Sequence, residues 1–280
     1  MVGLAPLGPP YDSRSPYPPM PYIDTHAHLD QSDFDPDREQ TLLRSRQAGV
    51  EAVVCVGTTA DSSEAAVRLA EADEAVYAAV GIQPNCVAEA SPRDWERIVG
   101  LVDHPRVVAI GETGLDRYWD FTPIEQQEDS FVRHLDLAAR RELPVLIHCR
   151  ECETDVLAML RQAAGEKPLR GILHAFSGTP AFAESCLELG LHLSFAGMVS
   201  YTNKKFRPLR EIAKTVPEDR LLLETDSPYL VPHPLRGKQK RNEPAWIVHT
   251  AQALAELRDC PVEALAASTT ANARRLFGLP

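Results

Sequence analysis

Eight short apolar runs recur along the chain, and a stretch with helical periodicity follows each of them. The runs are rich in Val, Ile, Leu and Ala, which is typical of parallel strands whose two faces are both buried. Strands that alternate with helices in this way indicate a parallel α/β fold. The candidate strands are residues 22–28, 52–57, 76–81, 107–112, 145–148, 171–175, 191–195 and 221–225.

Helix signals fill the segments between these strands. Ser91-Pro92, Thr122-Pro123 and Thr179-Pro180 each read as an N-cap followed by proline at the first helical position. Eight strand–helix units predict a closed (β/α)8 TIM barrel, with an open doubly wound sheet as the alternative. The candidate helices lie near 35–48, 61–73, 92–102, 123–141, 152–164, 179–189, 206–216, 244–257 and 261–276.

The first 21 residues differ from the rest of the chain. They contain seven prolines and few side chains able to pack, so we expect a disordered leader. Met20 stands directly before the first candidate strand and is a possible natural start. Residues 22–280 are then expected to form a single barrel domain, because a barrel of this type typically has about 250 residues.

No segment indicates export or membrane insertion. The longest uncharged stretch, 189–203, is shorter than the roughly 20 apolar residues that a membrane span needs. The amino-terminal segment lacks the cationic region of a signal peptide. Six cysteines in 280 residues do not resemble a secreted disulfide framework, although Cys149 and Cys152 form a CxxC pair. We expect a cytoplasmic protein without membrane association, and nothing indicates a protein partner.

Metal-binding residue types end several of the candidate strands. In a strand, residues two apart share a face, so His26 and His28 point the same way, and Asp24 lies one layer deeper, where it could orient an imidazole. Active sites of this fold lie at the carboxyl ends of the strands. The complete set at these ends is His26, His28, Glu112, His148, His174 and Asp226.

Four imidazoles and two carboxylates exceed the needs of one tetrahedral metal. They suit two divalent ions that share a bridging carboxylate. Each residue alone has a plainer interpretation, such as a core histidine or a helix cap. Ionisable groups are rarely buried unpaired, however, and these six end five strands at one depth. Zn or Mn suits the imidazoles best, and the carboxylates could recruit Mg.

The other five histidines are expected to lie outside this cluster. His104, His134, His192 and His249 are interpreted as structural or exposed. His233 follows the last strand and is the one that could touch substrate.

The distribution of charge suggests the substrate. The net charge is −11, which excludes a generic nucleic-acid coat protein. Segments 197–210 and 230–241 nevertheless contain no acidic residue, and both follow candidate strands on the functional face. Such a basic region favours a polyanion, although solvated loops are the plainer interpretation. Its cations are Lys204, Lys205, Arg207, Arg210, Arg236, Lys238, Lys240 and Arg241, and candidate stacking residues are Tyr118, Trp119, Tyr201 and Tyr229.

Six motifs, in order, resemble the TatD family of metal-dependent hydrolases. They are IDTHAHLD (23–30), AIGETGLDRYW (109–119), LPVLIHCRE (143–151), GILHAFSG (171–178), LLLETDSPYL (221–230) and KRNEPAW (240–246). The resemblance implies that the six strand-end residues are the metal ligands and that Glu112 bridges. It also implies DNase activity, including 3′→5′ exonuclease action on single-stranded DNA; some relatives remove D-amino acids from tRNA.

One segment departs from the family pattern. The family usually carries Gly-x-His-Pro-His after the third strand, whereas this chain has Gly81-Ile82-Gln83-Pro84-Asn85. Amides can hydrogen-bond but cannot carry charge at neutral pH. The departure removes no expected ligand and bears on substrate preference or rate.

The sequence thus predicts a nuclease in which Asp226 accepts a proton from the attacking water and Glu112 joins the two ions. Lys204, Lys205, Arg241 and Tyr118 are the predicted contacts to single-stranded DNA. An ester or amide hydrolase with the same metals, such as a D-aminoacyl-tRNA deacylase, is the alternative. A third hypothesis, a non-catalytic metal-stabilised binding protein, would require Asp226 to be idle.

Overall fold

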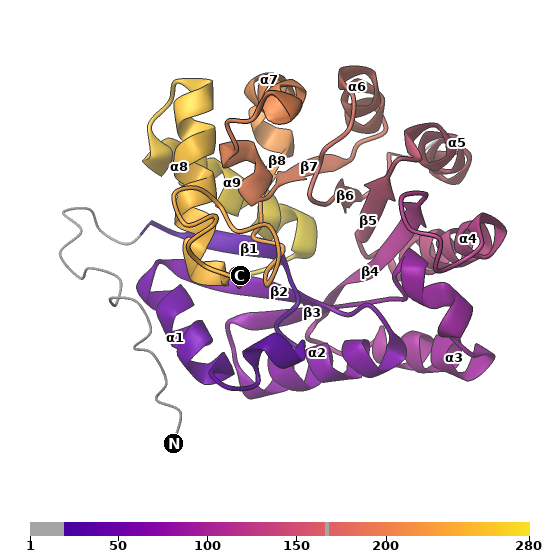
Figure 1. Ribbon diagram of the computed structural model, residues 1–280. Helices are drawn as coiled ribbons and strands as arrows, with labels where there is room; N and C mark the ends of the chain where they lie inside the picture. The colour runs from indigo at the N-terminus through magenta and orange to yellow at the C-terminus, as the bar shows by residue number, and fades with distance from the viewer. Residues whose placement is uncertain (1–19, 166–167) are drawn as a thin grey trace.

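The computed structural model describes residues 20–165 and 168–280, so the predicted leader falls almost wholly outside the described residues. Eight strands alternate with helices in the predicted order (Figure 1). The strands are β1 (Tyr22–Ala27), β2 (Val50–Val56), β3 (Val76–Val80), β4 (Val107–Asp116), β5 (Val145–Arg150), β6 (Gly171–Leu173), β7 (His192–Phe195) and β8 (Leu221–Leu223). The helices are α1 (Arg38–Gln47), α2 (Ala60–Ala72), α3 (Pro92–Leu101), α4 (Ile124–Arg141), α5 (Glu153–Ala164), α6 (Pro180–Glu188), α7 (Arg207–Thr215), α8 (Ile247–Arg258) and α9 (Val262–Phe277).

The strands form one parallel sheet in the order of the chain, from β1 to β8. The two edge strands meet just beyond their last residues. The amide of Asp226 donates to the carbonyl of His26 at 2.9 Å, and the amide of His28 donates to the carbonyl of Ser227 at 2.7 Å. The sheet is therefore a nearly closed (β/α)8 TIM barrel, and the doubly wound alternative is wrong.

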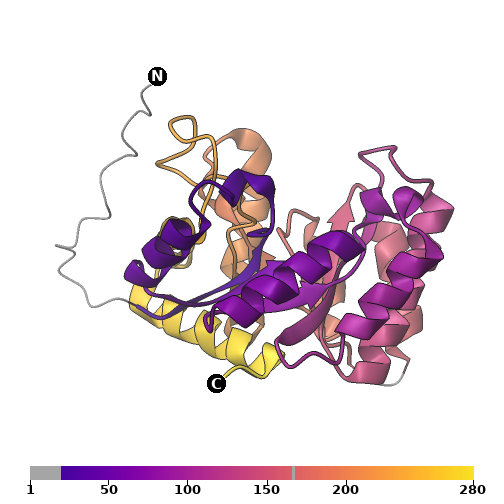
Figure 2. The same cartoon turned by 90° about the horizontal axis from the view of Figure 1, so that it is seen from below.

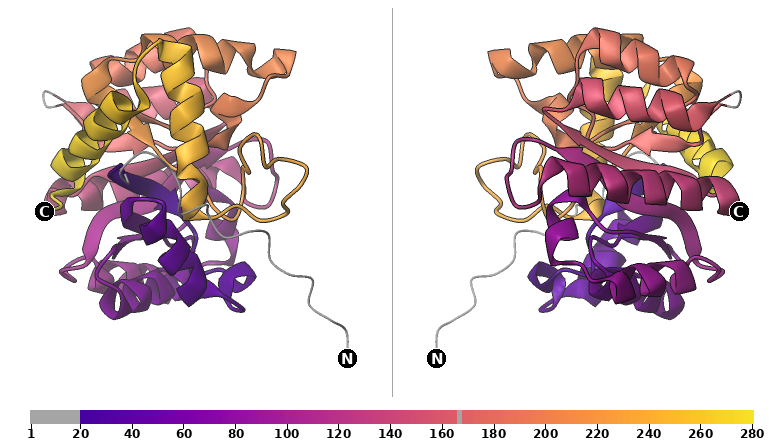
Figure 3. Two further views of the ribbon diagram at one scale, coloured as in Figure 1. Left: turned by 90° about the vertical axis from the view of Figure 1, so that its left-hand side faces the viewer. Right: turned by 90° about the vertical axis from the view of Figure 1, so that its right-hand side faces the viewer.

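Two apolar cores hold the barrel together. The larger core lies between strands and helices and includes Phe34, Ile98 and Phe131. The smaller core fills the barrel interior with side chains such as Ile172, and Leu276 and Phe277 of α9 close it. Figures 2 and 3 show α9 at the end of the barrel opposite the long loop that follows β8. The amino ends of the strands are thus covered, which leaves the carboxyl ends for chemistry.

Two of the three predicted helix caps are present. Ser91 and Asp94 form a reciprocal capping box on α3, and the Thr179 side chain accepts from the amide of Phe182 at the start of α6. The prediction for Thr122 is wrong. Its hydroxyl accepts from the amide of Ala88, and α4 begins after Pro123 without a side-chain cap. Among the described helices, none combines the length and apolar character that crossing a bilayer requires.

Candidate metal centre

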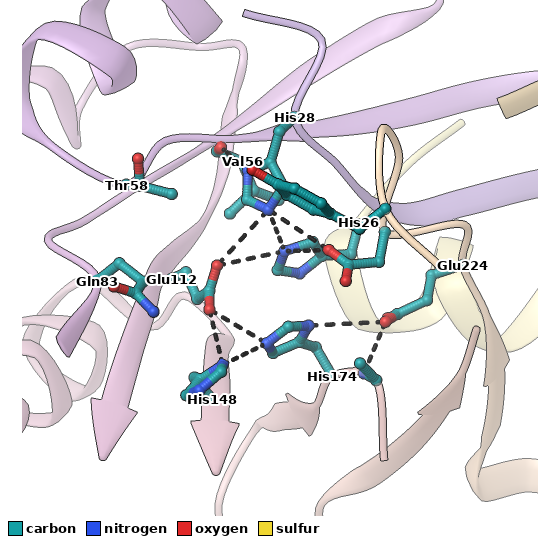
Figure 4. Close-up of polar contacts among 12 residues, drawn as sticks. His26, His28, Val56, Thr58, Gln83, Glu112, His148, His174 and Glu224 are labelled. Atoms are coloured by element: carbon teal, nitrogen blue, oxygen red, sulfur yellow. Dashed lines mark hydrogen bonds and ion pairs between the residues drawn. The ribbon is translucent and has the colours of Figure 1, made fainter. Parts of the chain in front are cut away.

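The barrel brings the six strand-end residues together at the carboxyl ends of its strands (Figure 4). All are buried except His148, which is partly exposed. Three overlapping groups of these side chains each present nitrogen or oxygen atoms within 4.8 Å of one another. The groups are His26, His28 and Glu112; Glu112, His148 and His174; and His26, His174 and Asp226.

Glu112 lies at the middle of the cluster, and its two oxygens face different imidazoles. Oε2 is 3.5 Å from Nε2 of His26 and 3.7 Å from Nε2 of His28. Oε1 is 3.0 Å from Nδ1 of His148 and 3.2 Å from Nε2 of His174. Figure 4 shows this carboxylate between the two pairs. The two oxygens of one carboxylate therefore face two separate pairs of imidazole nitrogens.

Asp226 approaches the first of these pairs from the loop after β8. Its Oδ1 lies 3.5 Å from Nε2 of His28 and 3.8 Å from Nε2 of His26. The residue has a φ of 53°, a left-handed conformation that Asp tolerates better than most residues do. The hydrogen bond from its backbone amide to the carbonyl of His26 holds it beside the pair.

Two glycines let β4 place Glu112. The pairing of β4 with β5 shifts between Ile110 and Thr113, so the strand has an irregularity at Gly111-Glu112. Gly111 and Gly114 have φ angles of 130° and 129°, which residues with a Cβ rarely adopt. A Cβ on Gly114 would lie 2.2 Å from the carbonyl oxygen of His148. Glycine at positions 111 and 114 is thus a geometric requirement of the way β4 carries Glu112.

Acceptors behind two of the imidazoles fix which nitrogen faces the centre. Nδ1 of His28 lies 2.8 Å from the carbonyl oxygen of Val56, and Nε2 of His148 lies 2.9 Å from Oδ2 of Asp116. A carbonyl or an ionised carboxylate can only accept, so these nitrogens carry the protons. In the neutral imidazoles the opposite nitrogens carry the lone pairs, and these nitrogens face Glu112. This is the arrangement that a metal ligand needs.

His174 and His26 are backed differently. Oε1 of Glu224, which is fully buried, accepts from the amide of Ala175 and lies 3.6 Å from Nδ1 of His174. Nδ1 of His26 and Nδ1 of His174 are both buried and have no hydrogen-bond partner among the described residues, but only that of His174 has a carboxylate nearby. The two imidazoles that face Oε1 of Glu112 therefore each have a carboxylate behind them, whereas those that face Oε2 do not.

Sequence reasoning missed Asp116 and Glu224, although both lie within the quoted motifs. The available signal was an acidic residue in an apolar strand or at its end, where burial demands a partner. The expectation for Asp24 is wrong. Its carboxylate accepts from the amide of Thr225 at 2.9 Å and from its hydroxyl at 2.5 Å. Asp24 thus joins β1 to the segment after β8 instead of orienting an imidazole.

The electrostatics of the cluster favour added positive charge. Burial alone would raise the pKa of Glu112, but the surrounding imidazoles, above all His174, hold it well below its usual value. Burial alone would lower the pKa of His28, yet its contact with Asp226 and the charge of Glu112 raise it to about 9. Burial and the charge of His174 lower the pKa of His26 to about 4. Two buried carboxylates among imidazoles fit a divalent cation that replaces the protons.

Gln83 and Asn85 occupy the segment that departs from the family pattern. The amide nitrogen of the Asn85 side chain donates to Oδ2 of Asp116 at 3.1 Å, and Oε1 of Gln83 accepts from the backbone of Asn85 at 2.8 Å. Asn85 therefore supports the same carboxylate oxygen that contacts His148.

The predicted substrate contacts have different surroundings. Lys204 and Lys205 are exposed on the segment after β7, and Tyr118 is 48% exposed on the loop after β4. Arg241 donates to the carboxylate of Asp37 at 2.6 and 3.0 Å, so binding a phosphate would require it to leave that partner. Tyr201 cannot stack on a base, which corrects its assignment. It is 4% exposed, and its hydroxyl donates to the carbonyl of Val231.

The remaining histidines lie outside the cluster. His134 and His192 are buried in α4 and β7, and His249 is part of α8. His104 lies before β4, beside Glu71. His233 is exposed on the loop after β8, where its amide donates to the hydroxyl of Ser200.

Comparisons with known proteins agree with this geometry. Residues 23–278 match the family model described as TatD related DNase. The chain is 40% identical to YabD of Bacillus subtilis, an uncharacterized metal-dependent hydrolase, over 91% of this chain and 98% of that protein. It is 37% identical to the 3'-5' ssDNA/RNA exonuclease TatD of Klebsiella pneumoniae, over 92% and 98% of the two chains. The crystal structure of YjjV, a TatD homologue from Escherichia coli K12, superposes with a TM-score of 0.86 at 31% identity, covering 92% of this chain and 98% of that one. The chain belongs to the TatD family of metal-dependent hydrolases.

Proposed function

We propose that the protein is a deoxyribonuclease that removes nucleotides from the 3′ end of single-stranded DNA, using two divalent ions held around Glu112. The relatives named as 3'-5' ssDNA/RNA exonucleases support this assignment.

We also place the protein in the cytoplasm, because all six cysteines carry free thiols, including Cys149 and Cys152, whose sulfurs are 3.9 Å apart.

Each oxygen of Glu112 defines one proposed ion position. His26, His28 and Asp226 would complete the position at Oε2, and His148 and His174 would complete the one at Oε1. When bound, Zn, Mn or Mg ions supply the Lewis acidity that polarises a phosphoryl oxygen and acidifies water. The imidazole-rich donor set suits Zn or Mn, and the two carboxylates extend the range to Mg.

The residues of the chain would orient the reactants and move the proton. Asp226 is a buried residue whose side chain keeps 13% of its surface exposed, and the hydrogen bond from its amide to the carbonyl of His26 holds it in the cluster. There it would accept the proton from the attacking water. Glu112 stays ionised because the imidazoles hold its pKa down, so it remains a ligand and not a proton donor. Asp116 and Val56 would keep His148 and His28 in the tautomers that face inward.

The proposal of a polyanionic substrate rests on one observation, a group of unpaired cations on the segments after β7 and β8. Among the described residues, these side chains form no ion pair with a carboxylate, in a protein whose net charge is −11. Such uncompensated charge attracts phosphates. The cations are Lys204, Lys205, Arg207, Arg210, Arg236, Lys238 and Lys240.

The two basic segments pack against each other. A Cβ on Gly197 would lie 2.0 Å from the carbonyl oxygen of Leu230, and the hydroxyl of Tyr201 donates to Val231. The guanidinium of Arg236 rests 3.8 Å from the centre of the Tyr201 ring. The two segments that carry the cations are therefore neighbours in the fold. Tyr229 is 51% exposed, and the centre of its ring lies 6.1 Å from that of His28, so it is a candidate for stacking on a base close to the proposed ion positions.

The test is a panel of oligonucleotides with a label at either end. We expect divalent ions to support shortening of single-stranded DNA from the 3′ end, with little action on a blunt duplex and none after chelation. Single-stranded RNA and a D-aminoacyl-tRNA complete the panel. Shortening from the 5′ end would overturn the polarity. Hydrolysis of the aminoacyl ester, with no cleavage of DNA or RNA, would instead establish a deacylase.

A further inference from the structure

Three large aromatic side chains are exposed on one short loop. Within the described residues, six large apolar or aromatic side chains are well exposed, and three of them fall between residues 118 and 121. Tyr118, Trp119 and Phe121 are 48%, 43% and 62% exposed. Exposing this much aromatic surface at one place is unfavourable in water unless the surface binds something.

The three rings form an ordered surface. The ring of Trp119 packs edge-on against Tyr118, with centroids 4.7 Å apart. It lies nearly parallel to the ring of Phe121, at 17° and 5.5 Å. The guanidinium of Arg150 rests 3.6 Å from the centre of the Tyr118 ring and has no carboxylate partner among the described residues. We call Tyr118, Trp119, Phe121 and Arg150 the aromatic ledge.

The ledge is joined to the candidate metal centre at two places. Oδ1 of Asp116 accepts from the amides of Tyr118 and Trp119, at 2.9 and 3.1 Å, while Oδ2 contacts His148. Arg150 also lines a cavity of about 280 Å³ that includes His174 in its wall. Figure 2 shows the loop after β4 rising on the same side of the barrel as the loop after β8. A strand whose end is in the centre could therefore reach the ledge.

We propose that the aromatic ledge is a stacking platform for unpaired bases and that it sets the preference for single-stranded over double-stranded nucleic acid. This inference rests on the proposed nuclease function and names the surface that selects its substrate. Bases offer their faces to aromatic rings only where they are not stacked in a duplex, and an unpaired guanidinium suits the adjoining phosphate. A purely apolar partner would leave Arg150 buried without a counter-charge.

The experiment measures the binding of a nuclease-resistant phosphorothioate decathymidylate to the metal-loaded protein. A second strand of equal length and charge carries no bases. The test variant is Trp119→Ala/Phe121→Ala, and Trp119→Phe retains a ring. Leu43→Ala removes an exposed apolar side chain from α1 and is the matched control.

The platform predicts that Trp119→Ala/Phe121→Ala loses roughly 5-fold to 100-fold in affinity for each stacked base. Trp119→Phe and Leu43→Ala should bind decathymidylate nearly as wild type does, and the base-free strand should bind all variants equally. The tryptophan fluorescence of the wild-type protein should be quenched by decathymidylate more than by the base-free strand, and Trp119→Phe, which leaves Trp95 and Trp246 in place, should lose this difference.

Unchanged affinity of Trp119→Ala/Phe121→Ala for decathymidylate would overturn the platform, as would an equal loss for the base-free strand. A shift from dimer to monomer in sedimentation, with DNA affinity unchanged, would show that the ledge is a self-association surface. Wild-type protein that shows the predicted binding and cleaves no nucleic acid would refute the nuclease function and leave the platform standing.

Discussion

Oδ2 of Asp116 lies 2.9 Å from Nε2 of His148, on the side of the imidazole opposite Glu112. The same carboxylate accepts from the side chain of Asn85 and from the backbone of the aromatic loop. One side chain thus fixes the tautomer of a candidate ligand and anchors the neighbouring surface. Loss of a partner that holds a metal ligand from behind typically weakens metal binding strongly.

Replacing Asp116 by Asn should therefore weaken metal binding. An amide can present its NH2 group to Nε2, which would move the ring proton to Nδ1 and block the lone pair that faces Glu112. We expect metal affinity to fall by about 10-fold to 100-fold. Calorimetric titration with Zn²⁺ or Mn²⁺ measures it. Asp120→Asn removes the same charge from an exposed position on this loop and is the control. Equal affinity in the two variants would show that Asp116 does not position His148.

The basic segments should contribute to DNA binding through charge. Replacing Lys204, Lys205, Lys238 and Lys240 by Ala leaves every proposed ligand in place. Affinity for single-stranded DNA should fall, and the slope of log affinity against log salt should decrease by roughly 0.7 for each phosphate that the protein no longer neutralises. Binding measured between low and moderate salt gives this slope.

A matched control removes four exposed cations at helical positions outside residues 197–210 and 230–241. It should weaken binding far less, because it leaves the cations of both basic segments in place. Equal slopes for the two quadruple variants would mean that only net charge matters and would contradict a defined basic surface. The control positions are Arg68, Arg93, Arg140 and Lys214.

Buried His134 should make the fold sensitive to acid. Its Nε2 accepts from the amide of Ile82, and burial is the main cause that lowers its pKa from 6.5 to about 4. Between pH 4 and pH 6.5 the unfolded chain therefore binds a proton at this histidine more readily than the folded protein does. The stability that neutral His134 contributes is complete above pH 6.5 and is lost as the pH falls towards 4, by roughly 3 kcal/mol.

Urea unfolding of the chelated protein at several pH values tests this dependence. His134→Gln should be less stable at pH 7, because a buried hydrogen bond is disturbed, but its stability should fall less steeply below pH 6.5. The other buried histidines titrate in both proteins, so their contribution cancels in the difference. His104→Gln, at a partly exposed histidine, should follow the wild-type curve. Parallel curves of stability against pH for wild type and His134→Gln would show that His134 is not the source of the acid sensitivity.

The sequence was sufficient to predict the barrel because periodicity reports burial directly. Apolar runs such as those of β2 and β5, each followed by a helical stretch, favour buried parallel strands, and His26 and His28 share a face by the geometry of a strand. Strand ends were less predictable. β4 continues four residues beyond Glu112, to Asp116, because an irregularity at Gly111 re-aims the strand instead of ending it.

The contacts behind the candidate ligands could not be predicted for the same reason. Asp116 reaches His148 across neighbouring strands, and Glu224 approaches His174 from β8 past the amide of Ala175. Both contacts depend on the register between strands, which no local pattern encodes. Asp24 shows the converse error. Its carboxylate accepts hydrogen bonds from Thr225, in the segment after β8, and therefore does not orient an imidazole.

The central claim is that Glu112 joins two ions, and a Mn²⁺ titration followed by electron paramagnetic resonance tests it most directly. Glu112 presents Oε2 to His26 and His28 and Oε1 to His148 and His174. We expect binding to saturate at two ions per chain, with the spectrum of a spin-coupled pair, and Glu112→Gln to lose that coupling. Saturation at one ion per chain, or two ions that give only the spectrum of isolated Mn²⁺ in the wild-type protein, would contradict the account.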